Sequence, residues 1–315
     1  MRSSRRVSPR PQGPFWFVYF LITVACIVSL KLAGMNWFDA VCHAFAALAL
    51  VGFSTYDASV GHFDSVPIEV VLIVFMLIAA MDSGRHFIAW QQKNLRTYLT
   101  SVEAQTMLVL IGVSTLGLSL FIWAHGVYPT FGTSLRHVAL NLVSIATDCG
   151  LVSQDYATWP VFAPVTILML SCYCANTGST GGGIKMSRTV VLFRQAGREL
   201  LRVVHPQAVA TVKIGGQAIQ NQVVIAVLAF VVLYFGTVVV LTSALLASGL
   251  DFVSAFSAII ACINNAGPGL GVVGPAGNDQ GLSDFQTWVC SLAMLLGRLE
   301  IFSVLVLFTP MYWRK

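Results

Sequence analysis

The chain has 315 residues, of which 57% are hydrophobic and only 10% are charged. Soluble domains carry about 25% charged residues, so this composition excludes an ordinary soluble domain, a disordered chain and a nucleic-acid-binding protein. The formal net charge of +5 is small, and its distribution along the chain is more informative than its sum.

Six apolar segments are candidates to cross a bilayer as helices, which requires about 20 mostly apolar residues each. In chain order they are residues 15–34, 67–90, 106–128, 160–176, 222–248 and 285–308. The fourth segment is short and ends at a cluster of glycines. The sequence therefore predicts an all-α polytopic membrane protein with six spans.

Basic residues mark one side of this predicted bundle. They precede the first span and follow the second, fourth and sixth spans, whereas the other three loops carry mainly aspartates and a single arginine, Arg136. Because loops rich in Lys and Arg stay in the cytoplasm, we expect both termini to be cytoplasmic and the aspartate-rich loops to face outward. An even number of spans agrees with this orientation.

Each of the three outer loops repeats one plan: an apolar run, a glycine and a polar stretch. The loops cover residues 38–57, 133–155 and 251–271. A helical run of 12–15 residues reaches only ~18–22 Å at 1.5 Å per residue, which is too short to span a bilayer. The runs are therefore predicted to be re-entrant half-helices, with Asp39, Ser134 and Asp251 as their N-caps.

Three equivalent glycine turns predict backbone segments that line one central pathway. Non-helical backbone at membrane depth is tolerated where it is buried or lines water. Glycine allows carbonyl groups to turn toward such a pathway, and rings of carbonyls replace the water shell of a potassium ion. The alternative is that the three loops are amphipathic surface segments.

Five stretches of the chain resemble the TrkH-type potassium uptake subunits of the Trk/Ktr/HKT superfamily. They are GFSTYDASVG (52–61), NTGSTGGGIKMSR (176–188), HPQAVATVKIGG (205–216), NNAGPGLG (264–271) and LLGRLEIFSVLVLFTP (295–310). The resemblance implies M1–P–M2 repeats around a potassium-channel-like pore, of which this chain is similar to repeats two, three and four. It divides the chain into a basic cytoplasmic linker (1–14) and repeats at 15–98, 99–215 and 216–315.

The resemblance also implies a selectivity filter whose backbone carbonyls bind K+. Its residues are Leu50, Val51, Gly52, Asp148, Cys149, Gly150, Asn265, Ala266 and Gly267. The chain departs from the family pattern at Val51, where a second glycine is common, and at Ala49, where threonine is common. Asp148 and Cys149 stand where the family usually has threonines. The resemblance implies K+ as the transported ion, and we expect neither a transition-metal site nor a covalently bound cofactor.

The glycine cluster at residues 177–185 interrupts the fourth span. It is not a phosphate-binding P-loop, because Gly183 is followed by Ile184 rather than by lysine. Consecutive glycines predict a broken helix, and a simple kink is the alternative to a functional loop. The resemblance implies that the cluster is an intramembrane gate, latched by an arginine of the last span. The gate residues are then Gly178, Ser179, Thr180, Gly181, Gly182, Gly183, Lys185 and Arg298.

The segment between Lys185 and Lys213 is basic and partly amphipathic. It is interpreted either as a helix that faces lipid headgroups or as a docking surface for a cytoplasmic regulatory ring. The resemblance implies that such a ring is the nucleotide-binding TrkA-type partner. A homodimer is a further expectation, and the inner membrane is the expected location.

The favoured function is therefore potassium uptake through a carbonyl filter with a glycine-rich gate, in a chain that is incomplete alone because three filter turns leave one side open. The alternatives are a non-conducting fragment or regulatory remnant, and a carrier-type secondary transporter. An enzyme is disfavoured, because the sequence offers no convergent nucleophile and base.

Overall fold

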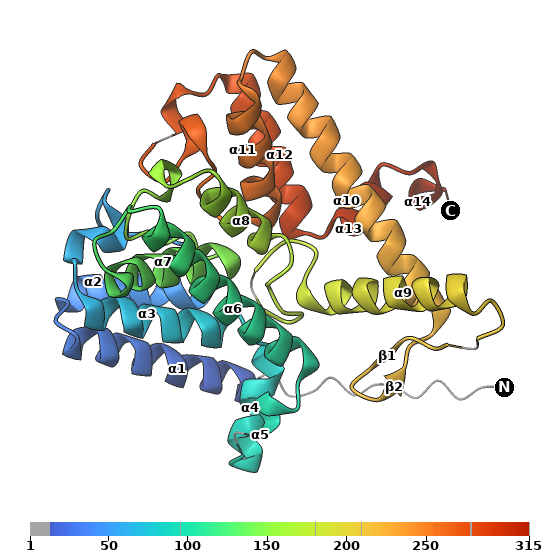
Figure 1. Ribbon diagram of the computed structural model, residues 1–315, viewed down its shortest axis with the longest axis horizontal. Coiled ribbons are helices and arrows are strands. Elements are labelled where there is room, and N and C mark those ends of the chain that lie inside the picture. Colours follow the sequence, from blue (N-terminus) through green and yellow to red (C-terminus); the bar gives the residue numbers. More distant parts are fainter. Residues whose placement is uncertain (1–12, 95, 180, 209, 278, 315) are drawn as a thin grey trace.

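The computed structural model describes residues 13–94, 96–179, 181–208, 210–277 and 279–314, and these are mostly helical. Figure 1 shows the chain as a set of helices in which short, buried helices lie among longer ones. The fold is that of an all-α polytopic membrane protein, as the composition predicts.

A sequence of long helix, short helix, irregular turn and second helix occurs three times. The first unit contains α1 (Gly13–Leu32), α2 (Trp37–Ala49), α3 (Val66–Ala79) and α4 (Ser83–Gln92), followed by the short α5 (Arg96–Leu99). The second contains α6 (Val102–Ala124), α7 (Phe131–Ala146), α8 (Phe162–Ser171) and α9 (Met186–Val204). The third contains α10 (Asn221–Ala247), α11 (Phe252–Asn264), α12 (Asp284–Arg298) and α13 (Ile301–Leu307), followed by α14 (Pro310–Trp313).

Small elements connect these helices. Short 3-10 turns lie at Ser59–Phe63, Tyr156–Thr158, Gly271–Val273 and Asp279–Gly281. One antiparallel hairpin pairs β1 (Lys213–Ile214) with β2 (Gln217–Ala218), and it follows α9 in the chain.

Two of the predicted spans are broken rather than straight. The α3 and α4 helices meet at 94°, and α12 and α13 meet at 111°. At the first break Asp82 caps the new helix, because its side chain accepts a hydrogen bond of 2.9 Å from the amide of Gly84. At the second break Glu300 adopts a positive φ of 61°. The predicted spans 67–90 and 285–308 are therefore each made of two helices that meet at a bend.

By length and hydropathy, α6 and α10 can each cross a membrane, and counting each bent pair as one span raises the number to four among the described residues. The remaining predicted spans are shorter apolar helices, α1 and α8. The α8 helix ends at Ser171, five residues before the predicted end, because the chain turns there into the segment that leads to the glycine cluster.

The short helices α2, α7 and α11 are the half-helices that the sequence predicts, and they form the buried centre of the fold. The α7 and α11 helices carry long runs of buried residues, and α2 buries one face, whereas α6 and α10 expose valines and leucines such as Val113 and Val239 along their outer faces. An apolar exterior around a core of short helices is the arrangement expected of a protein surrounded by lipid.

The N-caps of the half-helices differ in part from the prediction. Asp251 caps α11, as predicted, but Asn36 caps α2 and Thr130 caps α7. The observed caps of α2 and α7 lie three and four residues before the predicted ones, so Asp39 and Ser134 lie inside the first turns. Their side chains instead contact neighbouring segments, as Ser134 Oγ does by donating to the Ser119 carbonyl at 2.8 Å.

Candidate functional site

Each half-helix ends in a three-residue turn with the same backbone conformation. The first and third residues of every turn have a positive φ: Leu50 (51°) and Gly52 (68°), Asp148 (62°) and Gly150 (92°), Asn265 (58°) and Gly267 (92°). In an extended strand successive carbonyls point to opposite sides, and a left-handed residue at every second position turns them toward one side. This is the backbone geometry with which a chain can present several carbonyl oxygens to one cation.

The three turns lie against one another although they are far apart in the sequence. A Cβ atom added to Gly52 would overlap the carbonyl oxygen of Cys149, and one added to Gly150 would lie 2.9 Å from the carbonyl oxygen of Ala266. Glycine is therefore required here both for its positive φ and for the close approach of neighbouring backbones. The predicted filter residues are brought together by the fold.

A cavity of about 710 Å³ opens on the side of the polar loops, next to all three filter turns. Gly52, Gly150 and Gly267 form its floor, and Asp57 and Asp155 are the charged residues that line it. The described lining includes neither Lys nor Arg. A negatively charged entrance raises the local concentration of cations.

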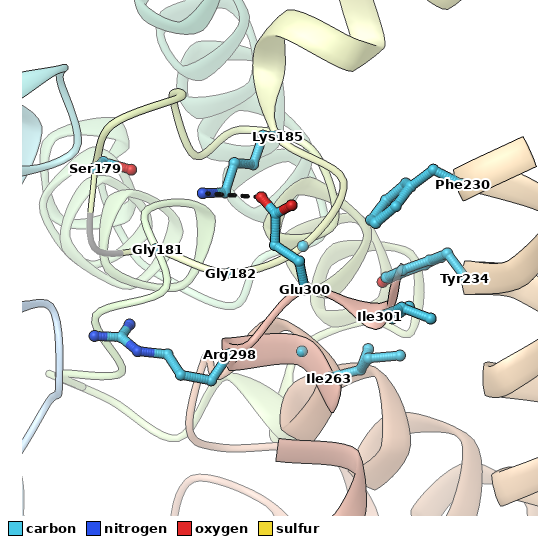
Figure 2. A pocket seen from close by; sticks show the side chains of 12 residues that line it. Ser179, Gly181, Gly182, Lys185, Phe230, Tyr234, Ile263, Arg298, Glu300 and Ile301 are labelled. Atoms are coloured by element: carbon cyan, nitrogen blue, oxygen red, sulfur yellow. Dashed lines mark ion pairs between the residues drawn. The ribbon is translucent and has the colours of Figure 1, made fainter. Parts of the chain in front are cut away.

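A smaller cavity of about 200 Å³ lies on the opposite side of the filter and is lined by the predicted gate. Its walls include Ser179, three consecutive glycines and two cations, Lys185 and Arg298. Figure 2 shows the chain at Gly181 and Gly182 running between the side chains of Lys185 and Arg298. The structure thus brings the glycine cluster and Arg298, 115 or more residues apart in sequence, into one site; Thr180 lies outside the described residues.

The segment 177–185, hereafter the glycine loop, packs directly on the inner end of the filter. A Cβ atom on Gly182 would overlap the carbonyl oxygen of Asn264, the residue that precedes the third filter turn. A Cβ atom on Gly181 would lie 2.9 Å from Oδ2 of Asp148. The loop is held at both ends by backbone hydrogen bonds of 2.7 Å, from Ile184 N to the Cys172 carbonyl and from Met186 N to the Ala175 carbonyl.

Ion pairs connect the glycine loop to the break between α12 and α13. Glu300 pairs with Arg188 at 3.0 Å and with Lys185 at 3.9 Å. Arg188 also stacks on the ring of Phe230, 4.1 Å from its centroid. Lys185 and Glu300 both have positive φ values, 71° and 61°, so two strained residues face each other across this contact (Figure 2).

Buried polar contacts support the filter from behind. The Tyr234 hydroxyl donates a 2.8 Å hydrogen bond to Oδ1 of Asn264, and Nδ2 of Asn264 donates to Ser171 Oγ at 2.9 Å. On the outer side, Arg136 of α7 makes a bidentate pair with Glu69 of α3, at 2.9 and 2.8 Å. Bidentate Arg–carboxylate pairs are among the strongest polar contacts in proteins, so this one joins two units next to the filter.

Sequence reasoning missed several of these residues. Tyr234, Glu69 and Arg136 lie outside the motifs, and Asn264 lies at the start of one, but none of their partners is local: these lie 30 to 93 residues away in the chain. The available signal was polarity at membrane depth, which usually marks a residue that faces the protein interior. That signal does not specify partners, such as the pairing of Glu300 with Arg188 and Lys185.

Comparisons with known proteins agree with this geometry. The family model described as "Cation transport protein" (TrkH) matches residues 14–315. The chain is 41% identical over 304 residues to "Trk system potassium uptake protein TrkH" of Salmonella typhimurium, covering 95% of this chain and 62% of that protein. It is 36% identical over 300 residues to "Trk system potassium uptake protein TrkG" of Escherichia coli, covering 95% of this chain and 61% of that protein.

The fold is also similar to a solved structure. The crystal structure of the potassium transporter TrkH from Vibrio parahaemolyticus matches with a TM-score of 0.92 and 40% sequence identity, covering 97% of this chain and 66% of that one. The chain thus spans slightly less than two thirds of the relatives it matches. A family match over almost the whole chain, together with these identities, shows that the chain belongs to the TrkH family of cation transport proteins.

Proposed function

We propose that the protein takes part in the uptake of potassium across the inner membrane, with K+ passing through the three filter turns. The observation that carries this proposal is the repeated backbone conformation at Gly52, Gly150 and Gly267, each at the end of a buried half-helix. Half-helix C-termini add negative dipole ends close to such a site. The names of the relatives, which are potassium uptake proteins, support K+ as the ion.

The gate in this proposal is the glycine loop, which covers the inner end of the filter. Arg298 and Lys185 place positive charge in the cavity just beneath the filter, and Glu300, which lines the same cavity and pairs with Lys185 at 3.9 Å, offsets part of it. The remaining positive charge opposes the passage of a cation. Conduction then requires the loop to withdraw and these side chains to move. We assign Gly178, Ser179 and Gly181–Gly183 to the mobile part of the gate and Arg298 to the latch; Thr180, which the resemblance also implies for the gate, lies outside the described residues.

The three units at 15–98, 99–215 and 216–315 are the proposed pore repeats, with 1–14 as a basic linker and both termini in the cytoplasm. The basic helix α9 and the following hairpin are the proposed contact with lipid headgroups and with a cytoplasmic nucleotide-binding ring of the TrkA type. Homodimerisation is part of the same proposal. Transport rather than catalysis is favoured by the names of the relatives, which are potassium uptake proteins.

A flux assay with matched glycine variants tests the function. Liposomes containing the chain, alone and with the N-terminal portion of a TrkH relative, are assayed for 86Rb+ uptake in competition with K+ and Na+. Gly150→Ala is expected to abolish K+-competed uptake, because its Cβ meets the backbone of the third filter turn. Gly117→Ala is the control, since an added Cβ there has no neighbour within 4 Å.

Arg298→Ala is expected to raise flux in the same assay, because it removes a positive charge from the cavity beneath the filter. Flux that is identical in the Gly150→Ala and Gly117→Ala proteins would contradict a carbonyl filter. Uptake that depends on a second, co-transported solute would favour the carrier alternative, and no flux in any combination would favour a non-conducting chain.

A further inference from the structure

Asp148 is the ionisable residue of the second filter turn, and its carboxylate has an unusual environment. The residue is 1% exposed, and neither carboxylate oxygen makes a hydrogen bond of acceptable geometry with the residues that the structure describes. The other two turns place Leu50 and Asn265 at the same left-handed position. A negative charge at this point is therefore a feature of one turn only.

The carboxylate faces the place where the glycine loop touches the filter. The position of a Cβ atom on Gly181 would lie 2.9 Å from Asp148 Oδ2 and 3.4 Å from the Thr147 carbonyl oxygen. The neighbouring Gly182 packs on the carbonyl oxygen of Asn264. One carboxylate oxygen, and the backbone oxygens of the two residues that precede the second and third filter turns, thus meet the same two glycines.

The glycine loop compensates the negative charge of Asp148 only weakly. The Gly182 amide approaches the carboxylate, and Lys185 attracts it electrostatically, but Lys185 is shared with Glu300 at 3.9 Å. A buried carboxylate without full hydrogen bonding is costly. When the loop withdraws, the carboxylate loses both of these groups, because both belong to the loop, and its charge then requires compensation by another positive charge.

We propose that Asp148, together with the carbonyl oxygens of Thr147 and Asn264, forms a cation site at the inner end of the filter that the glycine loop covers in this conformation. An oxygen set with one full negative charge favours a divalent over a monovalent cation of similar radius, because the Coulomb attraction scales with the charge of the ligand. Ba2+ is the suitable probe, since its radius is close to that of K+. This inference takes only one element from the proposed function, namely that the ion pathway runs through the filter turns.

Binding of Ba2+ and of K+ to the purified full chain, measured by isothermal titration calorimetry, tests this site without any conduction. Asp148→Asn keeps the size of the side chain and removes its charge. If the site exists, this variant weakens K+ binding about 10-fold and Ba2+ binding about 100-fold, the square of the monovalent effect. Asp284→Asn is the matched control, because it removes the same charge from an exposed residue that lines neither cavity; both affinities are expected to stay within about 3-fold.

A second variant approaches the same site from the loop. Gly181→Ala places a methyl group against Asp148 Oδ2, displaces the loop and is expected to strengthen Ba2+ binding, an effect that Asp148→Asn removes in the double variant. Equal Ba2+ affinities for the unaltered chain and Asp148→Asn, with K+ binding intact, would overturn the inference, as would an unchanged Ba2+ affinity in Gly181→Ala.

The outcomes also separate this inference from the proposed function. Ba2+ binding that depends on Asp148 in a chain without K+ binding would support the site and count against potassium uptake. If the unaltered chain bound neither Ba2+ nor K+, both proposals would be overturned.

Discussion

At the scale of single residues, the filter region is stabilised by charges that are paired out of water. Glu69 is almost fully buried, with its side chain 3% exposed, and its partner Arg136 is 23% exposed. Asp64, which also contacts Arg136 at 2.7 Å, is 78% exposed. The buried Glu69–Arg136 pair is therefore expected to contribute more to the free energy of unfolding than the exposed Asp64–Arg136 pair, because exposed ion pairs contribute little.

Glu69→Gln is therefore expected to lower the free energy of unfolding by about 2 kcal/mol. This is less than the ~3–5 kcal/mol typical of breaking a buried pair, because Asp64 still faces Arg136. Thermal unfolding of the detergent-solubilised chain is the measurement, and Asp64→Asn is the matched control, expected to change the unfolding free energy by about 0–1 kcal/mol. Equal destabilisation by the two variants would show that burial does not distinguish the two contacts.

At the scale of elements, α9 has two opposite faces with different surroundings. One face packs on the hairpin region and on the start of α10 through buried Val191, and polar bonds flank this contact: Arg194 donates to the Lys213 carbonyl and Arg198 donates to Asn221 Oδ1. The other face exposes a continuous apolar stripe: Phe193 (76%), Leu200 (70%), Val203 (79%) and Val204 (69%). An amphipathic helix with arginines beside an exposed apolar stripe is typical of the membrane interface.

Spin labels on α9 test whether lipid covers this stripe. A nitroxide at Phe193→Cys or Leu200→Cys is expected to be accessible to oxygen and protected from a water-soluble nickel reagent, because the apolar stripe lies in lipid. A label at Glu199→Cys is the control, because the Glu199 side chain is 50% exposed beside Arg198 and Arg202. This label should be accessible to the nickel reagent and less accessible to oxygen. Protection from both reagents at 193 and 200 would instead place a second protein, such as another copy of the chain, on the stripe.

At the scale of the whole molecule, two cavities flank the filter. The larger one carries Asp57 and Asp155, and the smaller one carries Lys185, Arg298 and Glu300 beneath the glycine loop. In the proposed orientation, in which the basic loops stay in the cytoplasm, the larger cavity faces outward. Its carboxylates then attract cations, and the glycine loop covers the inner end of the proposed pathway.

Cysteine labelling in intact cells tests this orientation. A membrane-impermeant maleimide is expected to label cysteines introduced at Asp57 and Asp155 but not those at Lys93 or Arg202, which are reached only after the cells are opened. Six of the seven native cysteines are buried and Cys42 is partly buried, so background labelling is low. Labelling at Lys93 and Arg202 in intact cells would reverse both the topology and the outer assignment of the larger cavity.

Patterns formed by neighbouring residues in the chain were sufficient to predict the half-helices and part of the candidate site. Hydrophobic runs too short to span a bilayer predicted α2, α7 and α11, and the glycine after each run predicted the position of the filter turns, because run length and glycine conformation are properties of neighbouring residues. The glycine cluster likewise predicted the break after α8.

Only the tertiary structure decided which distant groups meet. The breaks at Asp82 and Glu300 interrupt apolar segments that read as continuous spans, since hydropathy does not register the capping bond and ion pairs that favour a bend. The contact of Gly181 with Asp148 and the pairing of Glu300 with Arg188 join residues that are 33 and 112 positions apart. The sequence by itself therefore determined the kind of protein and the local form of its filter, whereas packing between distant segments decided how the gate meets the filter, because burial and charge pairing depend on neighbours that the linear order does not specify.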